Sequence, residues 1–434
     1  AVASEEAKKW QQTHPLSKRS IYLRKPFETH GKVKSAIIYI CGLGHYELSL
    51  NGEKVGDDQF APLWSDYDKT VYYNAYDVTE NIETKNTIGV LLGNGFYNEQ
   101  GGRYVKMQVS FGPPTLFFNM QLTYEDGSTE EIVSDESWKY SLSPIVFNDM
   151  YGGEDYDARL EQKGWNTWSF DDSEWRAVVI QEPPKGKLTP QTAPPVKIME
   201  TYPIKEIKKG DNFYTLDMGQ NLSGFPLIRV SGKKGDKIRL IVGENLNEDG
   251  SVNQSQSGAP HYYEYTLKGE GEEIWHPRFS YYGYRYIQVE GGKMKNSNDD
   301  SNLPVVNDVK SCFVYNSAPQ TGHFHCSNSI FNDAHRIIVN AMKSNFQAVF
   351  TDCPHREKLG WLEQVHLNGP GLFYNFNLTT FAPKIMRDIR DAQLPNGLVP
   401  DIAPEYVIFE GGFRDSPEWG STSVILPFMY YQYY

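Results

Sequence analysis

The 434-residue sequence predicts a multidomain fold in which two antiparallel, jelly-roll-like β-sandwich domains precede an all-α region. Short β-branched and aromatic stretches, separated by Gly, Pro and Asn turns, fill the chain to about residue 316. A proline-rich stretch at 183–195 interrupts them and is typical of a linker. Near residue 318 the apolar spacing changes to that of an amphipathic helix, which predicts the all-α region.

The first predicted sandwich covers residues 20–199 and follows an N-terminal extension at residues 1–19. The apolar run at 35–41 has the length of a strand, and the hairpin signal Asn51-Gly52 follows an alternating segment. A second hairpin is predicted at 116–133, with its turn at Asp126-Gly127. These short strands and tight turns indicate a sandwich.

The second predicted sandwich covers residues 200–318. It contains the strand-like segments 214–225 and 275–286, and the turn signal Asp249-Gly250. Its polar residues Asp217, Glu244 and Arg285 suit a site, but we expect them to fix turns and strand ends.

The all-α region is predicted from residue 319 onward. Its first helix is carried by the apolar spacing of Ile330, Phe331, Ala334, Ile337, Ile338, Ala341, Met342 and Phe346. Ser327 or Ser329 is the expected N-cap. Further helices are predicted at about 361–376, 379–393 and 420–434. Between the last two, residues 394–419 form a long loop rich in Pro, Gly and acids, and loops of this length between helices are usually functional.

Composition excludes several classes of partner. The net charge of −13 argues against nucleic acid and against an anionic membrane surface. No apolar run reaches the roughly 18 residues of a membrane span. The cysteines, Cys41, Cys312, Cys326 and Cys353, show neither metal-ligand spacing nor a disulfide framework. His355 and His366 have no evident third ligand, and no phosphate loop or dinucleotide fingerprint is present, so we expect no metal and no cofactor.

The stretch from Phe350 to Gln364 lies between two segments of helical periodicity. Pro354 and Gly360 keep it from being helical itself. It carries carboxylates beside a guanidinium and an indole, a combination that suits a site for a polar small molecule. A solvated loop with salt bridges is the alternative, because loops collect both charge and function.

The segment Asp352-Cys-Pro-His-Arg-Glu-Lys-Leu-Gly-Trp361 resembles the active-site signature of bacterial α-L-rhamnosidases of glycoside hydrolase family 78. That signature usually reads Asp-Cys-Pro-Gln-Arg, one or two acids, then Arg-Leu-Gly-Trp-Thr-Gly-Asp. Segments 151–168, 214–225 and 275–286 also resemble parts of the family's two sandwiches, so the resemblance covers nearly the whole chain. It implies that the helices begin a six-hairpin (α/α) toroid. It also implies that the first sandwich either contacts carbohydrate or serves as a structural accessory domain.

The resemblance implies hydrolysis of terminal α-L-rhamnose from glycosides or polysaccharides, with inversion of configuration. Such hydrolysis needs one protonated acid and a second carboxylate. Glu357 matches the family's proton donor, and Asp352 its sugar-binding aspartate. Arg356 and Trp361 match positions that shape the pocket, while Lys358 replaces the family's Arg and keeps its charge.

The chain departs from the family after the tryptophan, where it reads Leu362-Glu363-Gln364 instead of Thr-Gly-Asp. The aligned acid is therefore an amide, which holds a hydroxyl without charge. In the long loop, Asp401 and Glu405 are weaker candidates than Asp415 and Glu418. The predicted substrate-binding residues are Asp352, Arg356, Trp361, Glu363, Gln364, Asp415, Glu418 and Trp419.

A six-hairpin toroid needs about twelve helices, or roughly 300 residues, and only about four are predicted after residue 318. The chain also stops inside the apolar segment 424–434. We therefore expect a truncated toroid, a general base beyond residue 434, and little or no activity from the 434-residue chain alone. Family members act on plant glycosides and pectic polysaccharides, so an exported bacterial protein, periplasmic or extracellular, is expected by analogy.

Two other classes of function compete with hydrolysis. A non-catalytic carbohydrate-binding protein with a degenerate or incomplete hydrolase domain is favoured by Gln364, but not by the intact Asp352, Glu357 and Trp361. A polysaccharide lyase needs a Tyr or His base and a cation that neutralises a uronate. The central loop offers paired acids instead, so the lyase ranks last.

Overall fold

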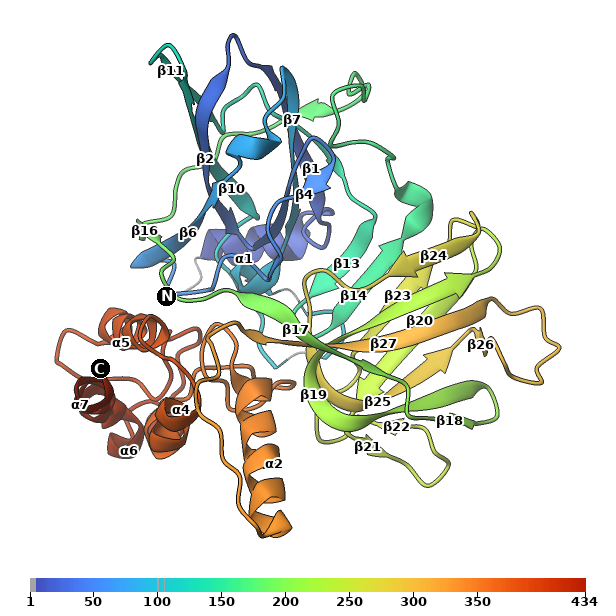
Figure 1. The fold of residues 1–434 in the computed structure, drawn as a ribbon, viewed down its shortest axis with the longest axis vertical. Coiled ribbons are helices and arrows are strands. Elements are labelled where there is room, and N and C mark those ends of the chain that lie inside the picture. The colour runs from blue at the N-terminus through green and yellow to red at the C-terminus, as the bar shows by residue number, and fades with distance from the viewer. Residues whose placement is uncertain (1–4, 100, 105) are drawn as a thin grey trace.

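The computed structural model describes residues 5–99, 101–104 and 106–434. Figure 1 shows two β-rich bodies followed by a smaller group of helices. This order confirms the predicted fold class of two β-sandwich domains followed by an α-helical region. A short helix, α1 (Glu5–Thr13), precedes the first β body. Among the residues described, we find no helix with the length and apolarity needed to span a bilayer.

The first β body is a sandwich of two sheets that enclose an apolar core. One sheet has the strand order β15 (Arg176–Ala177), β12 (Lys139–Leu142), β1 (Ile21–Glu28), β7 (Lys85–Gly93), β3 (His45–Leu50) and β4 (Glu53–Lys54). The other has the order β11 (Thr129–Val133), β10 (Thr115–Tyr124), β2 (Val33–Leu43), β6 (Thr70–Asp77) and β16 (Lys187–Pro190). The predicted β3–β4 hairpin turns at Asn51 and Gly52, whose φ angles of 54° and 91° explain the Asn-Gly pair.

The second β body is built on a twelve-stranded sheet. Its main path runs β13 (Ile145–Asp149), β14 (Gly153–Asp157), β23 (Tyr262–Thr266), β20 (Lys237–Gly243), β25 (Tyr282–Glu290), β19 (Phe213–Ser231), β27 (Val305–Asn316), β17 (Val196–Pro203) and β5 (Asp58–Gln59). The strands β18 (Glu206–Lys209) and β24 (Glu272–Trp275) pair with β19, and β26 (Lys293–Met294) pairs with β27. Strands β13 and β14 come from the stretch assigned to the first sandwich, and β14 pairs in parallel with β23. The two β bodies therefore share chain segments.

Smaller elements complete the β bodies. Two-stranded ladders join β8 (Asn98–Glu99) to β9 (Val109–Ser110), and β21 (Asn245–Leu246) to β22 (Val252–Asn253). The second of these turns at the predicted Asp249-Gly250. Short 3₁₀ turns are η1 (Thr79–Asn81), η2 (Gly95–Tyr97), η3 (Ala158–Leu160) and η4 (Gly411–Phe413).

The helical region contains α2 (Ser329–Asn345), α3 (Glu363–Leu367), α4 (Gly369–Asn375), α5 (Phe381–Ala392), α6 (Pro417–Gly420) and α7 (Thr422–Tyr433). The helix predicted at 361–376 is therefore two short helices, α3 and α4, with Asn368 between them. The predicted cap of α2 was wrong, because the side chain of Asn328 accepts the hydrogen bond from the Ile330 N–H. Asn shares the short acceptor side chain that makes Ser a good cap.

The helical region has one side that packs into a core and one side that is exposed to solvent. Phe346, Phe350 and Phe381 form an aromatic core, with ring centroids of Phe346 and Phe381 4.6 Å apart. By contrast, the apolar residues that predicted α2 lie largely on its open side, where Ile330 is 72% exposed and Phe331 59%. In Figure 1, α2 stands apart from the cluster of α4 to α7.

Candidate active site

The loop between α2 and α3, here called the acid loop (residues 352–361), packs against the second β body. The Gly283 N–H donates to the Pro354 carbonyl at 2.9 Å. The Tyr151 hydroxyl donates to the carbonyl of Glu357, and the Arg356 guanidinium donates to the Gln256 carbonyl at 2.8 Å. The loop is thus fixed from outside the helical region to which it belongs.

The Glu357 carboxylate has fixed partners yet remains partly exposed to solvent. Its side chain is 18% exposed. The indole Nε1 of Trp361 donates to one oxygen at 3.0 Å, while the Lys106 ammonium lies 3.3 Å from the other. The Arg356 Nε is 4.0 Å from that second oxygen. A carboxyl group with a fixed orientation and remaining access is suited to exchange a proton with a bound molecule.

Asp352 lies within electrostatic reach of Glu357. Its backbone N–H donates to the Leu359 carbonyl at 3.2 Å, and its Oδ1 accepts from the Leu359 N–H at 3.3 Å. Burial, together with the nearby charge of Glu357, raises the pKa of Asp352 to about 6. Like charges in a partly buried site disfavour double ionisation, so the nearby charge of Glu357 opposes ionisation of Asp352.

The long loop at 394–419 runs along the acid loop, as the two hydrogen bonds between them show. The Leu362 N–H donates to the Asp401 carbonyl at 2.9 Å, and the Ala403 N–H donates to the Gly360 carbonyl at 3.0 Å. The long loop also brings aromatic rings to Trp361. Phe409 stacks on it with ring centroids 5.3 Å apart, and Trp419 meets it edge-on at 6.4 Å. Trp361 is therefore fixed by aromatic packing on two sides.

The acids of the long loop fall into two groups. Asp401 is buried and accepts the Ser416 N–H at 2.9 Å, and Glu405 pairs with Arg414 at 2.7 Å. Asp415 and Glu418 are exposed. Burial and the charges of these two acids raise the pKa of Asp401. Asp401 and Glu405 thus shape the loop, while Asp415 and Glu418 remain the members that face solvent.

Glu363 and Gln364 lie in the first turn of α3 and are partly exposed. Within the part of the chain that the structure describes, no hydrogen bond or ion pair links either side chain to Glu357. Their predicted contact with substrate stays a prediction.

Three residues that are distant in sequence reach the acid loop. Lys106 and Tyr104 reach it from the first β body, and burial, with the charge of Glu357, raises the pKa of Tyr104. Glu244 lies 3.5 Å from the imidazole Nε2 of His355. More than 100 residues separate each of these from the loop. No local pattern pointed to Lys106 or Tyr104, and Glu244 was expected only to fix a turn or a strand end. Asp217 and Arg285, in contrast, pair across neighbouring strands at 2.7 Å, in the structural role expected of them.

No group of three or more His, Cys, Asp or Glu side chains is placed to hold a metal ion within residues 5–99, 101–104 and 106–434. The chemistry available at the acid loop is that of carboxyl groups, an indole and two cationic side chains.

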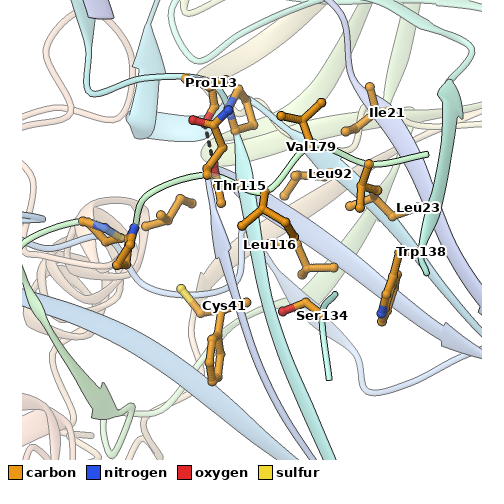
Figure 2. Close-up of a pocket in the computed structure, with 18 of the residues that line it drawn as sticks. Ile21, Leu23, Cys41, Leu92, Pro113, Thr115, Leu116, Ser134, Trp138 and Val179 are labelled. Carbon is orange, nitrogen blue, oxygen red and sulfur yellow. Dashed lines mark hydrogen bonds between the residues drawn. The ribbon is translucent and has the colours of Figure 1, made fainter. Parts of the chain in front are cut away.

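A cavity of about 500 Å³ lies elsewhere, between the two sheets of the first β body. Figure 2 shows side chains that line it, among them Ile21, Leu23, Leu92, Leu116 and Trp138. Sugar sites need polar groups that hydrogen-bond to hydroxyls. This mostly aliphatic wall offers few of them, so it does not suit a monosaccharide.

Three family models match the chain, one after another. They describe the α-L-rhamnosidase N-terminal domain at residues 31–200, the bacterial α-L-rhamnosidase concanavalin-like domain at 207–315 and the bacterial α-L-rhamnosidase six-hairpin glycosidase domain at 319–434.

Two curated relatives named α-L-rhamnosidase are similar along nearly all of this chain. The protein from Formosa agariphila is 36% identical over 432 residues, which cover 95% of this chain and 44% of the relative. The protein from Streptomyces avermitilis is 35% identical over 433 residues, which cover 98% of this chain and 41% of the relative. The chain thus spans less than half the length of these curated relatives.

Two solved structures share the fold. The α-L-rhamnosidase from Dictyoglumus thermophilum superposes with a TM-score of 0.86 at 37% identity, covering 95% of this chain and 46% of that one. The Streptomyces avermitilis α-L-rhamnosidase complexed with L-rhamnose has a TM-score of 0.87 at 35% identity. The match covers 96% of this chain and 40% of that one.

Proposed function

This chain belongs to the bacterial α-L-rhamnosidase family, and from that premise we propose that its protein hydrolyses α-L-rhamnosides with Glu357 as the general acid. The observation that carries the proposal is the fixed carboxyl of Glu357, held by the Trp361 indole beside a second acid, Asp352. Family membership supplies the substrate class, and a related structure is described as complexed with L-rhamnose.

In this proposal Glu357 donates a proton to the glycosidic oxygen as the bond to the sugar breaks. Asp352 accepts hydrogen bonds from sugar hydroxyls, and Trp361, braced by Phe409 and Trp419, packs against the sugar's apolar face. Arg356, Glu363, Gln364, Asp415 and Glu418 stay proposed substrate contacts. The inverting stereochemistry rests on the resemblance alone, and we assign no general base.

The raised pKa of Asp352 makes it the competing candidate for the acid. A general acid must hold its proton near the working pH, and Asp352 does so up to about pH 6. The partial exposure of Glu357 and its single indole hydrogen bond favour Glu357 as the group that reaches a ligand. Substituting each carboxyl separately decides between them.

The test is release of L-rhamnose from an aryl α-L-rhamnoside by the complete gene product. We expect Glu357→Gln to lower kcat by about 10²-fold or more, because a general acid contributes about 10²–10⁴-fold. Asp352→Asn should raise KM more than it lowers kcat. Glu131→Gln, a matched change at an exposed position of β11 in the first β body, should stay within a few-fold of the parent.

Full activity of Glu357→Gln would remove the acid assignment. An inert parent that still binds rhamnose would instead favour a non-catalytic carbohydrate-binding protein. We rank that alternative second, because the matched family model for residues 319–434 is that of a glycosidase domain.

We also propose that the protein works outside the cytoplasm, by analogy with family members that act on plant glycosides and pectic polysaccharides. Fractionation of the source cells tests this: recovery of the protein in the cytoplasm alone would contradict it.

A further inference from the structure

Lys358, the residue after Glu357, occupies an unusual position for a lysine. Its side chain is fully buried, with 0% exposure. Its backbone φ is +56°, in the left-handed region that residues with a Cβ rarely adopt. Both features cost free energy, so contacts from the surrounding structure must hold this residue in place.

Those contacts come from the second β body. The Lys358 ammonium donates to the Met150 carbonyl, beside strand β13, and to the Tyr281 carbonyl, beside β25, at 2.6 Å. It also lies over aromatic rings, 4.1 Å from the ring centroid of Tyr282 and 4.6 Å from that of Tyr281. The ion pairs found among the described residues do not include Lys358, so carbonyl dipoles and ring faces solvate the cation.

The compensating negative charge lies behind Met150. Asp149 accepts the N–H groups of Gly101, Tyr151 and Gly152, and Glu99 accepts that of Met150. The buried Glu99 Oε2 has no donor among the described residues. Burial and the charge of Asp149 raise the pKa of Glu99 well above its ordinary value. Met150 links the two sides, because its carbonyl accepts from Lys358 and its N–H donates to Glu99.

The turn at Met150–Tyr151 also contacts the main chain of Glu357. The Tyr151 hydroxyl donates to the Glu357 carbonyl, and the Tyr282 hydroxyl donates to the Tyr151 carbonyl. The main chain of Glu357 and the side chain of Lys358 therefore both bind the turn Met150–Tyr151, between strands β13 and β14 of the second β body. We propose that Lys358 is a positioning residue for Glu357, whose buried ammonium clamps the acid loop to the Met150–Tyr151 turn and to Tyr281.

The clamp depends on charge. Burial lowers the pKa of Lys358 to about 7, against the opposing pull of Glu99, Asp149 and the Cys353 thiol. The other facing groups stay neutral near this pH: burial raises the pKa values of Tyr151, Tyr281 and Tyr282 well above 10 and lowers that of His261 to about 3. Lys358 therefore loses its charge as pH rises through about 7, and its two carbonyl contacts weaken when it does.

Stability and activity should then diverge above pH 7. The folded pKa of Lys358 lies below the unfolded value of about 10.4, so between these values the unfolded chain binds more protons and the folded state gains stability as pH rises. The acid loop loses its clamp over the same range. Activity limited by Lys358 thus falls while global stability does not.

The experiment compares Lys358→Met with Lys358→Arg in the complete gene product. We expect Lys358→Met to lower kcat by about 10–100-fold with KM changed less than about threefold, because a small misplacement of a catalytic group costs up to about 10²-fold. Lys358→Arg should keep kcat within about fivefold and move the alkaline limit of activity upward, because the guanidinium stays protonated.

Lys384 provides a matched control. It is also a buried lysine that joins the helical region to the first β body, since its ammonium donates to the Trp64 carbonyl at 3.1 Å and pairs with Asp388 at 2.7 Å. Lys384→Met should lower the thermal midpoint of unfolding yet keep the parent's kcat and pH profile. If Lys384→Met reproduced the kinetic changes of Lys358→Met, the effect would be general destabilisation and the proposal would fall.

This inference rests on the proposed function for its kinetic readout, so a second measurement is independent of activity. Backbone hydrogen exchange of residues 352–359 should be faster in Lys358→Met and unchanged in Lys358→Arg and Lys384→Met. If no rhamnoside is cleaved while exchange responds this way, the proposed function fails and the clamp stands. Parent-like exchange together with parent-like kinetics in Lys358→Met would overturn the clamp.

Discussion

The acid loop and α2 are neighbours in the chain but are held in opposite ways. On α2 the apolar residues Ile330 and Phe331 face outward, 72% and 59% exposed. In the acid loop the charged Lys358 and the apolar Leu359 are both fully buried. Burial therefore does not follow polarity in this region, since a lysine is inside and a phenylalanine is outside.

The difference shows where the geometry of the site comes from. Three hydrogen bonds join the loop to Tyr151, Gln256 and Gly283, all of which belong to the second β body. The open face of α2 contributes nothing to these contacts. Contacts with the β bodies thus position the acid loop, while the open face of α2 plays no part. The four predictions below test this difference.

The largest expected effect is a difference in stability between substitutions on the packed side of the helical region and on its exposed side. Phe381 has 0% exposure and meets Phe346 and Phe350 edge-to-face, so Phe381→Ala should cost about 3–5 kcal/mol. Phe331→Ala on α2 should cost less than about 0.5 kcal/mol. Urea unfolding of the 434-residue chain, followed by helical circular dichroism, measures both. Equal costs would mean that the outer face of α2 is packed in solution and would break the comparison.

The next effect concerns pH. The folded pKa of Asp352 is about 6, above the unfolded value of about 3.9. Between these values the folded state binds more protons, so this group makes the protein less stable as pH rises from about 4 to 6, by about 1–3 kcal/mol.

Asp352→Asn has no such proton site, and its stability relative to the parent should rise by that amount between pH 4 and pH 7. Asp333→Asn, in an exposed pair with Arg336 on α2, should show less than about 0.5 kcal/mol of pH-dependent change. Denaturant titrations at several pH values check both variants. A flat difference for Asp352→Asn would show that its carboxyl is not buried as described.

The third effect is on catalysis. Trp361→Phe keeps an aromatic ring but removes the N–H that orients Glu357, and we expect kcat to fall about tenfold, the worth of one hydrogen bond to a charged group. Trp419→Phe touches the same aromatic cluster without touching Glu357 and should lose less than about threefold. Initial rates on an aryl rhamnoside give both numbers. The opposite ranking would mean that packing, and not the hydrogen bond, positions the acid.

The smallest effect should come from Lys106, whose side chain is 37% exposed. An ion pair this accessible contributes about 0–1 kcal/mol, so Lys106→Met should change kcat/KM by less than about fivefold, and by less still at high salt. Lys32→Met, which breaks the surface pair with Glu125, serves as a control far from the loop. A loss of kcat/KM above about 10²-fold would mean that Lys106 takes part directly in the reaction.

Sequence reasoning succeeded where structure is local. The Asn51-Gly52 turn, the 115–133 hairpin and the helix beginning near Ile330 follow from spacing and turn chemistry within a few residues. The segment carrying Asp352, Glu357 and Trp361 stood out by its motif, and the structure brings these three residues together.

The rest depended on contacts between distant segments. Nothing near residues 145–157 indicates that β14 pairs with β23 across more than 100 residues. Lys358 looks like a surface residue in sequence, because lysine is rarely buried, and only the folded β bodies supply its carbonyl partners. The cap of α2 was missed by one residue, since Ser327, Asn328 and Ser329 offer equivalent short acceptors.

The hydrogen bonds between the acid loop and the β bodies also imply an order of folding, in which the β bodies form before the loop docks. The hydrogen bond from Tyr151 to Glu357 spans 206 residues, and that from Lys358 to Met150 spans 208. Contacts of such sequence separation form late, because the entropy of closing the loop must be overcome before they contribute. During synthesis both β bodies emerge before the loop, and domains fold as units from the N-terminus. The acid therefore reaches its working position last, on a surface that is already built.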